Sequence, residues 1–179
     1  LQIWRGGMSF HGALLGIFAV AWAISRKQKA SLFSYTDILC TVAPVGIGLG
    51  RLANFINGEL AGKTTNASWG VVFPRLYDMQ PRHPSQLYEA FGEGFLLFVI
   101  LLAVSRRTLN RPGLQSALFL ISYGLIRFVI EFYRLPDPQL GKIVGLNLGQ
   151  YLCLGMILMG GIIVTKRLKI IFPKTDTPL

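Results

Sequence analysis

The stretch TVAPVGIGLGRLANFINGELAG, residues 41–62, joins an apolar run to a polar end. Its first half belongs to an apolar run over residues 35–56 and contains Pro44 and three glycines, which would weaken a helix in water. In a membrane bundle, small residues instead let helix backbones approach closely. The polar residues of the second half are Arg51, Asn54, Asn57 and Glu59. Because such groups are costly inside a membrane, their place at the end of an apolar helix predicts a functional site.

The composition supports a membrane protein. The 179 residues are 52% hydrophobic and 15% charged, with a mean hydropathy of +0.50, whereas soluble domains average about 25% charged residues. The net charge of +10 does not indicate a nucleic-acid partner, because many of the basic residues form three short clusters between apolar runs. These clusters are Arg26, Lys27 and Lys29; Arg106, Arg107 and Arg111; and Lys166, Arg167, Lys169 and Lys174.

Five apolar runs predict an all-α, polytopic membrane bundle with about five transmembrane helices. The runs cover residues 10–25, 35–56, 84–105, 114–133 and 148–165. The basic clusters follow the first, third and fifth runs, which places those ends and the C-terminus in the cytoplasm. We therefore expect one membrane-embedded domain over residues 1–171, an extracytoplasmic loop over 58–82 and a disordered cytoplasmic tail over 172–179. The polar residues then gather toward the outer face.

Charged residues in the fourth run, YGLIRFVIEFYR (residues 123–134), share one helical face. Tyr123, Arg127 and Glu131 are spaced by four residues, and Arg134 continues the face. An arginine at the centre of a span costs about 2.5–3.5 kcal/mol on insertion scales, so it requires a partner. One interpretation is a structural ion pair between Arg127 and Glu131. The other is that Arg127 faces an anionic group of a substrate.

The polar end of the second run predicts a related site. Arg51 and Asn54 are three residues apart and would project from one helix end. A guanidinium binds phosphate with two parallel hydrogen bonds, and the abundant phosphate of a membrane belongs to a lipid. Asn57 is either a helix-end cap or part of this site. Glu59 is either a counter-ion of Arg51 or a proton acceptor.

The two histidines and a pair of glutamates complete the candidates. His11 lies between glycines and suits proton transfer near neutral pH. His83 is either a hydrogen-bonded structural residue or a substrate contact at the outer end of the third run. Glu89 and Glu93 are four residues apart within that run and require a basic partner. Neither histidine has other metal-binding residues at a suitable spacing, so we expect no metal. We also expect no cofactor.

Four blocks of this sequence resemble the bacterial prolipoprotein diacylglyceryl transferase family. GRLANFINGELAG (residues 50–62) meets every fixed position of the family signature G-R-x-(G/A)-N-F-x-N-x-E-x-x-G. GGMSFHGALLG, RHPSQLYEA and YGLIRFVIEFYR are similar to three further family blocks, in the family order. The resemblance covers essentially the whole chain. Two departures stand out: Ala13 replaces the glycine usual after His-Gly, and the family's N-terminal helices, with an important tyrosine, have no counterpart here.

The resemblance implies a reaction at the bacterial cytoplasmic (inner) membrane. Family members transfer the sn-1,2-diacylglyceryl group from phosphatidylglycerol to the lipobox cysteine in the signal peptide of a prolipoprotein, releasing glycerol 1-phosphate. The resemblance places seven residues at the site: Arg51, Asn54, Glu59, Gly62, Tyr123, Arg127 and Glu131. We assign catalysis to Arg51, Arg127, Glu59, Glu131 and His11, with His11 as base. We expect lipid binding by both arginines together with Asn54, Asn57, Gly62, Tyr123, Arg134 and His83.

Other membrane functions fit the residues less well. A transporter or channel is the main alternative, but it predicts polar residues spread through the depth of several helices. An intramembrane serine protease requires a glycine-framed serine, and no G-x-S-x-G occurs. A phosphatidyltransferase that uses CDP-alcohols requires an aspartate-rich metal block, which the four aspartates do not form.

Overall fold

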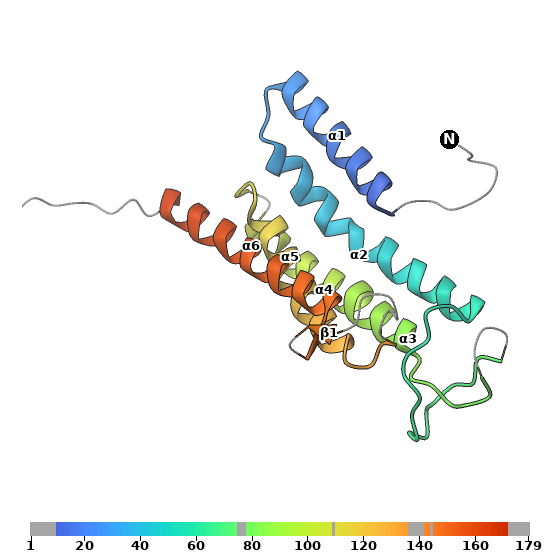
Figure 1. Cartoon of the computed structure of the whole chain (residues 1–179). Helices are drawn as coiled ribbons and strands as arrows, with labels where there is room; N and C mark the ends of the chain where they lie inside the picture. Colours follow the sequence, from blue (N-terminus) through green and yellow to red (C-terminus); the bar gives the residue numbers. More distant parts are fainter. Residues whose placement is uncertain (1–9, 75–77, 109, 136–141, 144, 172–179) are drawn as a thin grey trace, which may run out of the picture.

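All five apolar runs form helices in the computed structural model, which describes residues 10–74, 78–108, 110–135, 142–143 and 145–171. The helices are α1 (Phe10–Gln28), α2 (Leu32–Asn57), α3 (Ser85–Glu89), η2 (Ala90–Leu96), α4 (Leu97–Thr108), α5 (Leu114–Ile130) and α6 (Leu148–Ile171). Of these, α3, η2 and α4 follow one another without a break (Figure 1). A hairpin of two short strands, β1 (Lys142–Ile143) and β2 (Leu146–Asn147), precedes α6. The predicted helical class is therefore confirmed.

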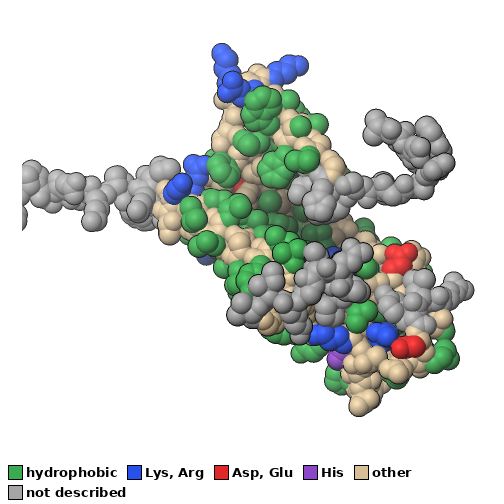
Figure 2. Space-filling view, viewed as in Figure 1, with side chains coloured by type: hydrophobic (Ala, Val, Ile, Leu, Met, Phe, Trp, Pro, Cys, Tyr) green, Lys and Arg blue, Asp and Glu red, His purple; other side chains and the backbone are tan. Residues whose placement is uncertain are grey.

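Three of these helices are long and apolar enough to cross a membrane: Leu32–Asn57, Ser85–Thr108 and Leu148–Arg167. Crossing the hydrocarbon takes about 20 residues, and α5 has only 17. Large apolar side chains point outward along the helices, among them Ile56 at 82% and Leu158 at 67% exposure (Figure 2). These features fit a helical membrane protein, and the expected number of about five spans stays a prediction.

The helices pack through backbone contacts at glycines. In Figure 1, α1 and α2 form an antiparallel pair, while α5 and α6 lie side by side. A Cβ at Gly94 of η2 would lie 2.6 Å from the Gly48 Cα of α2, and one at Gly160 of α6 would lie 2.8 Å from the Ala117 carbonyl of α5. The expected role of small residues is thus confirmed for Gly48 but not for Gly46 or Gly50, which have no such neighbour within 4 Å.

A buried carboxylate organises the helix ends near the basic clusters. Asp37 on α2 is 1% exposed and accepts hydrogen bonds from the Gly113 N–H (2.7 Å), the Ser116 N–H (2.8 Å) and the Ser116 hydroxyl (2.6 Å). The first N–H groups of a helix have no partner within the helix. Asp37 therefore caps the start of α5 from a neighbouring helix, a role that the sequence analysis did not predict.

The connection between α2 and α3 closes the opposite end. It begins at Gly58, whose φ of +77° ends α2 in a left-handed conformation. Isolated bridges pair Gly62 with Arg134, Thr64 with Arg82 and Val71 with Arg82. Within residues 68–74, the backbone pairing of the loop is the single bridge at Val71. The loop is anchored to both the start of α3 and the end of α5.

Candidate active site

Glu89 is the centre of a cluster of charges at the loop end of the helices. Its side chain is 0% exposed and lies at the end of α3. Arg51 from α2 approaches one carboxylate oxygen (Nε to Oε2, 2.8 Å), and Arg127 from α5 donates to the other (Nη1 to Oε1, 2.7 Å). Arg134 donates to the same Oε1 atom. One carboxylate therefore joins three arginines.

Glu93 lies one turn further along the same helix. It is also 0% exposed and accepts a hydrogen bond from Arg127 (Nη1 to Oε1, 3.1 Å). Its other oxygen is 4.0 Å from Nη2 of Arg51. The expected basic partners of the Glu89 and Glu93 pair are thus confirmed, and the same Nη1 atom of Arg127 contacts both carboxylates.

Glu131 completes the cluster at the end of α5. It lies 3.3 Å from Arg127 and 3.6 Å from Arg134. The predicted Arg127–Glu131 ion pair is therefore present, but it is one of several contacts of Arg127, and a role toward a substrate stays a prediction. We call Arg51, Arg127, Arg134, Glu89, Glu93 and Glu131 the arginine–carboxylate cluster. Its arginine side chains are 15–22% exposed, so an incoming molecule would meet the guanidinium groups first.

The part of the site that contains Glu93 lies on the π-helix η2. Single π-helical turns occur frequently at functional sites. A Cβ at Gly92 in this turn would lie 2.7 Å from Ile126 Cγ2, so η2 packs tightly on α5. Together with the approach of Gly94 to Gly48, this contact places Glu93 between α2 and α5.

Of the two interpretations of Glu59, the one that makes it the counter-ion of Arg51 is wrong, and its role as a proton acceptor stays a prediction. In the described part of the chain, the ion pairs of Arg51 are with Glu89 and Glu93. Glu59 instead accepts a hydrogen bond from the Asn54 side chain (3.0 Å) and is exposed. The reason is that α2 ends at Gly58, so Glu59 reaches back to Asn54 at the helix end. Asn57 is the last residue of α2 and is exposed.

Gly62 and Arg134 meet through their backbones. The Gly62 N–H donates to the His83 carbonyl (2.9 Å), and the neighbouring Lys63 N–H donates to the Tyr133 carbonyl (3.0 Å). A Cβ at Gly62 would lie 2.5 Å from the Tyr133 carbonyl oxygen. The absence of a side chain at Gly62 therefore lets the loop pack against the segment that carries Arg134.

His83 belongs to an aromatic group beside the cluster. Its Nδ1 lies 3.1 Å from the Tyr88 hydroxyl, which also accepts a hydrogen bond from Trp69 (2.8 Å). Its ring packs edge-on against Tyr133, with 5.2 Å between centroids. His83 is thus hydrogen-bonded within the protein, and its contact with a substrate stays a prediction.

Tyr123 and His11 are the remaining predicted residues. Tyr123 lies one turn before Arg127 on α5 and stacks on Phe119, with ring centroids 5.6 Å apart. His11 is in the first turn of α1, but its side chain lies outside the part of the chain that the structure describes.

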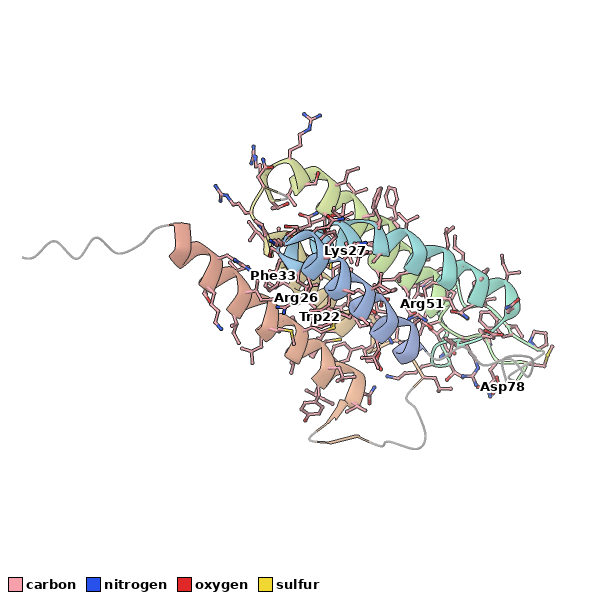
Figure 3. The ribbon with its side chains drawn as sticks, turned by 90° about the horizontal axis from the view of Figure 1, so that it is seen from above. Trp22, Arg26, Lys27, Phe33, Arg51 and Asp78 are labelled. Carbon is pink, nitrogen blue, oxygen red and sulfur yellow. The ribbon has the colours of Figure 1, made fainter. Side chains whose placement is uncertain are left out.

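The loop carries its own ion pair near the site. Arg82 is 9% exposed and donates to both carboxylate oxygens of Asp78 (3.2 Å each) and to the Gly62 carbonyl (3.3 Å). The hydrogen bond from Arg82 lowers the pKa of Asp78 below its usual range. Figure 3 shows Asp78 and Arg51 toward the same end of the molecule, away from Arg26 and Phe33.

An apolar groove of about 590 Å³ runs beside the cluster. Its lining residues come from the helix of α3 and η2 and from α5: Leu87, Tyr88, Phe91, Gly92, Leu125, Ile126, Val129 and Ile130. The groove therefore lies on the same helices that carry Glu89, Glu93 and Arg127. The sequence analysis did not predict this groove.

A metal would have few free ligands here. The described residues contain no group of three histidine, cysteine or acidic side chains that could hold a metal ion. The carboxylates of the cluster are instead paired with arginines.

Comparison with known proteins identifies the family. A family described as prolipoprotein diacylglyceryl transferase matches residues 1–166. The phosphatidylglycerol–prolipoprotein diacylglyceryl transferase of Rickettsia felis is 50% identical over 167 residues, which is 92% of this chain and 64% of that protein. The enzyme of the same name from Rickettsia typhi is 50% identical over 169 residues, covering 93% and 65%. The chain thus spans slightly less than two thirds of the length of these relatives. With its match over residues 1–166, the chain belongs to the prolipoprotein diacylglyceryl transferase family.

Proposed function

We propose that the protein transfers the sn-1,2-diacylglyceryl group of phosphatidylglycerol to the lipobox cysteine of prolipoproteins. The cysteine sulfur forms a thioether with the sn-3 carbon of the lipid, and the bond between that carbon and the phosphate oxygen breaks. Glycerol 1-phosphate leaves, and the thiol proton passes to a base. The name of the Rickettsia relatives, phosphatidylglycerol–prolipoprotein diacylglyceryl transferase, supports the proposed donor, acceptor and transferred group.

The convergence of Arg51 and Arg127 on one carboxylate carries the proposal. The two arginines come from different helices, yet each lies within 2.8 Å of an oxygen of Glu89. A phosphate group has a similar O–O spacing and binds guanidinium groups in the same two-pronged way. The pair can therefore hold the phosphate while negative charge develops on the leaving group, where fixed cations lower the barrier.

The surroundings suit the rest of the lipid. The apolar groove beside Glu89 and Arg127 would hold an acyl chain or the glycerol backbone at the membrane-facing side. We assign Asn54 and Tyr123 to lipid oxygens and Glu131 to the orientation of Arg127 and Arg134. Glu59 would act through Asn54, which it contacts. Asn57, Gly62 and His83 would contact the headgroup from the loop side.

The base remains His11 in this proposal. A cysteine thiol has a pKa of about 8.5 and reacts as the thiolate, so a group that accepts its proton speeds the reaction near neutral pH. We place the protein in the bacterial cytoplasmic (inner) membrane. The cluster would face outward and the basic ends, with the C-terminus, would face the cytoplasm.

A transfer assay tests the proposal. The complete protein in liposomes of phosphatidylglycerol would be given a prolipoprotein signal peptide, and mass spectrometry would follow the gain of one diacylglyceryl group. Release of glycerol phosphate should match it mole for mole. A peptide with serine in place of the lipobox cysteine is the control. The absence of any mass gain with the cysteine peptide would overturn the proposal.

A further inference from the structure

The arginine–carboxylate cluster is balanced before any lipid binds. Its three arginines face three glutamates, and every one of these glutamates contacts at least one of the arginines. Glu89 and Glu93 are both 0% exposed. A buried charge is tolerated only while it is paired. The balance therefore depends on the arginines keeping their contacts.

A lipid phosphate would disturb this balance. The phosphodiester of phosphatidylglycerol brings one further negative charge, and it would bind the partly exposed guanidinium groups of Arg51 and Arg127. Nη1 of Arg127 already serves two carboxylates, at 2.7 Å and 3.1 Å. Four anions would then share three cations in a site removed from water. Two carboxylates that share one site are the usual setting in which one of them takes a proton.

The contacts identify the carboxylate that would lose all its arginine partners when the lipid phosphate binds. Glu89 keeps Arg134 when Arg51 and Arg127 turn toward a phosphate. Glu131 likewise keeps Arg134, at 3.6 Å. Among the described residues, the ion pairs of Glu93 are with Arg127 at 3.1 Å and Arg51 at 4.0 Å. It therefore has no arginine left once these two bind the lipid.

We propose that binding of phosphatidylglycerol to this cluster takes up one proton from solvent, and that Glu93 receives it. The inference rests on the proposed function, because it assumes that the same arginines bind the lipid phosphate. The step forms one O–H bond on Glu93 and breaks no bond of the lipid. The bound complex is then electrically neutral within the cluster.

The groups that surround Glu93 come from four elements. Arg51 faces it from α2, Arg127 and Tyr123 from α5, and Glu89 from α3. Cys153 of α6 also lies within its electrostatic range. Glu131 and Arg134 complete the cluster beyond Arg127. Of these groups, Glu93 is the carboxylate that depends wholly on the two arginines proposed to bind phosphate.

Calorimetry measures the proton directly. Dioctanoyl-phosphatidylglycerol would be titrated into the complete, unmodified protein in detergent, in two buffers of different ionisation enthalpy. The difference in heat gives the number of protons taken up, and we expect about one per lipid. The dissociation constant should rise with pH, by up to about tenfold per pH unit where Glu93 is ionised in the free protein. Dioctanoylglycerol, which lacks the phosphate, should bind without proton uptake.

Variants assign the proton to Glu93. Glu93→Gln should bind the phospholipid with no proton uptake and with an affinity that no longer falls with pH. Asp37→Asn is the matched control, because it removes another buried carboxylate that lies outside the cluster, and it should retain the uptake. Infrared difference spectra of the unmodified protein should also show a protonated carboxyl band on lipid binding. This band keeps the test decisive if Glu93→Gln does not fold.

The outcomes separate the two proposals. Binding of the lipid without proton uptake would overturn this inference and leave the proposed function intact. Uptake that persists in Glu93→Gln would also overturn the assignment to Glu93. A folded protein that does not bind the lipid at all would refute both.

Discussion

Two buried carboxylate sites lie near opposite ends of the helices, and their partners differ. Asp37 is held by neutral donors, two backbone N–H groups and one hydroxyl, at 2.6–2.8 Å. The glutamates of the arginine–carboxylate cluster are held by guanidinium groups that are partly exposed. The Asp37 donors belong to the start of α5 and would lose their partner if Asp37 moved. Under the proposed function, in contrast, the arginines exchange a carboxylate for the lipid phosphate.

Under the proposed function, this difference separates an acid that holds the fold from acids that serve the lipid site. A carboxylate that accepts hydrogen bonds from the first turn of a helix fixes that helix in place. A carboxylate that shares a charged, partly exposed partner leaves that partner available to a ligand. We therefore expect changes at Asp37 to reduce stability and changes in the cluster to reduce transfer.

The largest effect is expected for Arg127→Lys. Lysine keeps the charge but loses the two-pronged geometry that reaches Glu89, Glu93 and Glu131. Removal of one fixed donor to a developing oxyanion typically costs about 100-fold or more in rate, so the transfer assay should lose most of its signal. Arg106→Lys, an exposed residue at the other end, is the control. Near-normal transfer by Arg127→Lys would exclude the phosphate role.

Asp37→Ala should act through stability. It leaves the Gly113 and Ser116 N–H groups buried without an acceptor, at a cost of about 1–3 kcal/mol for each unsatisfied group. We expect a lower thermal midpoint in detergent, with the rate per folded molecule little changed. Asp37→Asn retains an acceptor oxygen, so its thermal midpoint should lie between those of the unmodified protein and Asp37→Ala. A variant with unchanged stability but no transfer would contradict the comparison.

A smaller, local effect is expected for Gly62→Ala. The added methyl group would meet the Tyr133 and His83 carbonyl oxygens at 2.5 and 2.7 Å, so the segment that carries Arg134 must shift. Transfer should fall several-fold, mainly through weaker lipid binding. Gly46→Ala, where nothing lies within 4 Å, serves as the matched glycine control on α2. Equal behaviour of the two variants would show that the loop contact does not support the cluster.

The smallest effect is expected for Asp78→Asn. Arg82 lowers the pKa of Asp78, so the pair stabilises the fold above the ordinary aspartate pKa of about 3.9 and loses this contribution as the pH falls below it. Because Asp78 is exposed, the gain is small and screened by salt. Thermal midpoints of both proteins should differ slightly at pH 7 and converge at acidic pH. A difference that grows toward low pH would contradict the ion pair.

Periodicity and residue chemistry were sufficient to predict the helices and the need of the arginines for charged partners. The five apolar runs became five helical segments, and the spacing of Arg127 and Glu131 gave their ion pair. Glu89 and Glu93 were recognised only as acids in need of a base. That both would meet Arg51 and Arg127 depends on how α2, η2 and α5 pack, which no local pattern contains.

The missed features share this dependence on tertiary contacts. Asp37 begins an apolar run and finds its partners 76 and 79 residues away. A pairing of Glu59 with Arg51 was one of two interpretations, but the turn at Gly58 directs Glu59 to Asn54. The groove exists only where the helix of α3 and η2 meets α5. Short-range spacing predicts a helical face but not the element that faces it.

The π-helix contains the sequence FGEGF, residues 91–95. Its phenylalanines, glycines and glutamate lie in different surroundings. Phe91 and Phe95 point outward, at 61% and 62% exposure, while Gly92 and Gly94 touch α5 and α2 and Glu93 is buried between them. The depth of the acid is thus set on one side by the α2 backbone at Gly48 and on the other by the side chains of Ile126 and Ile130 on α5. The two contacts differ in how far they can yield. A methyl group at Gly92 would meet isoleucine side chains, which can change rotamer, whereas one at Gly94 would meet the Gly48 Cα at 2.6 Å and would have to shift a helix backbone, and with it Glu93.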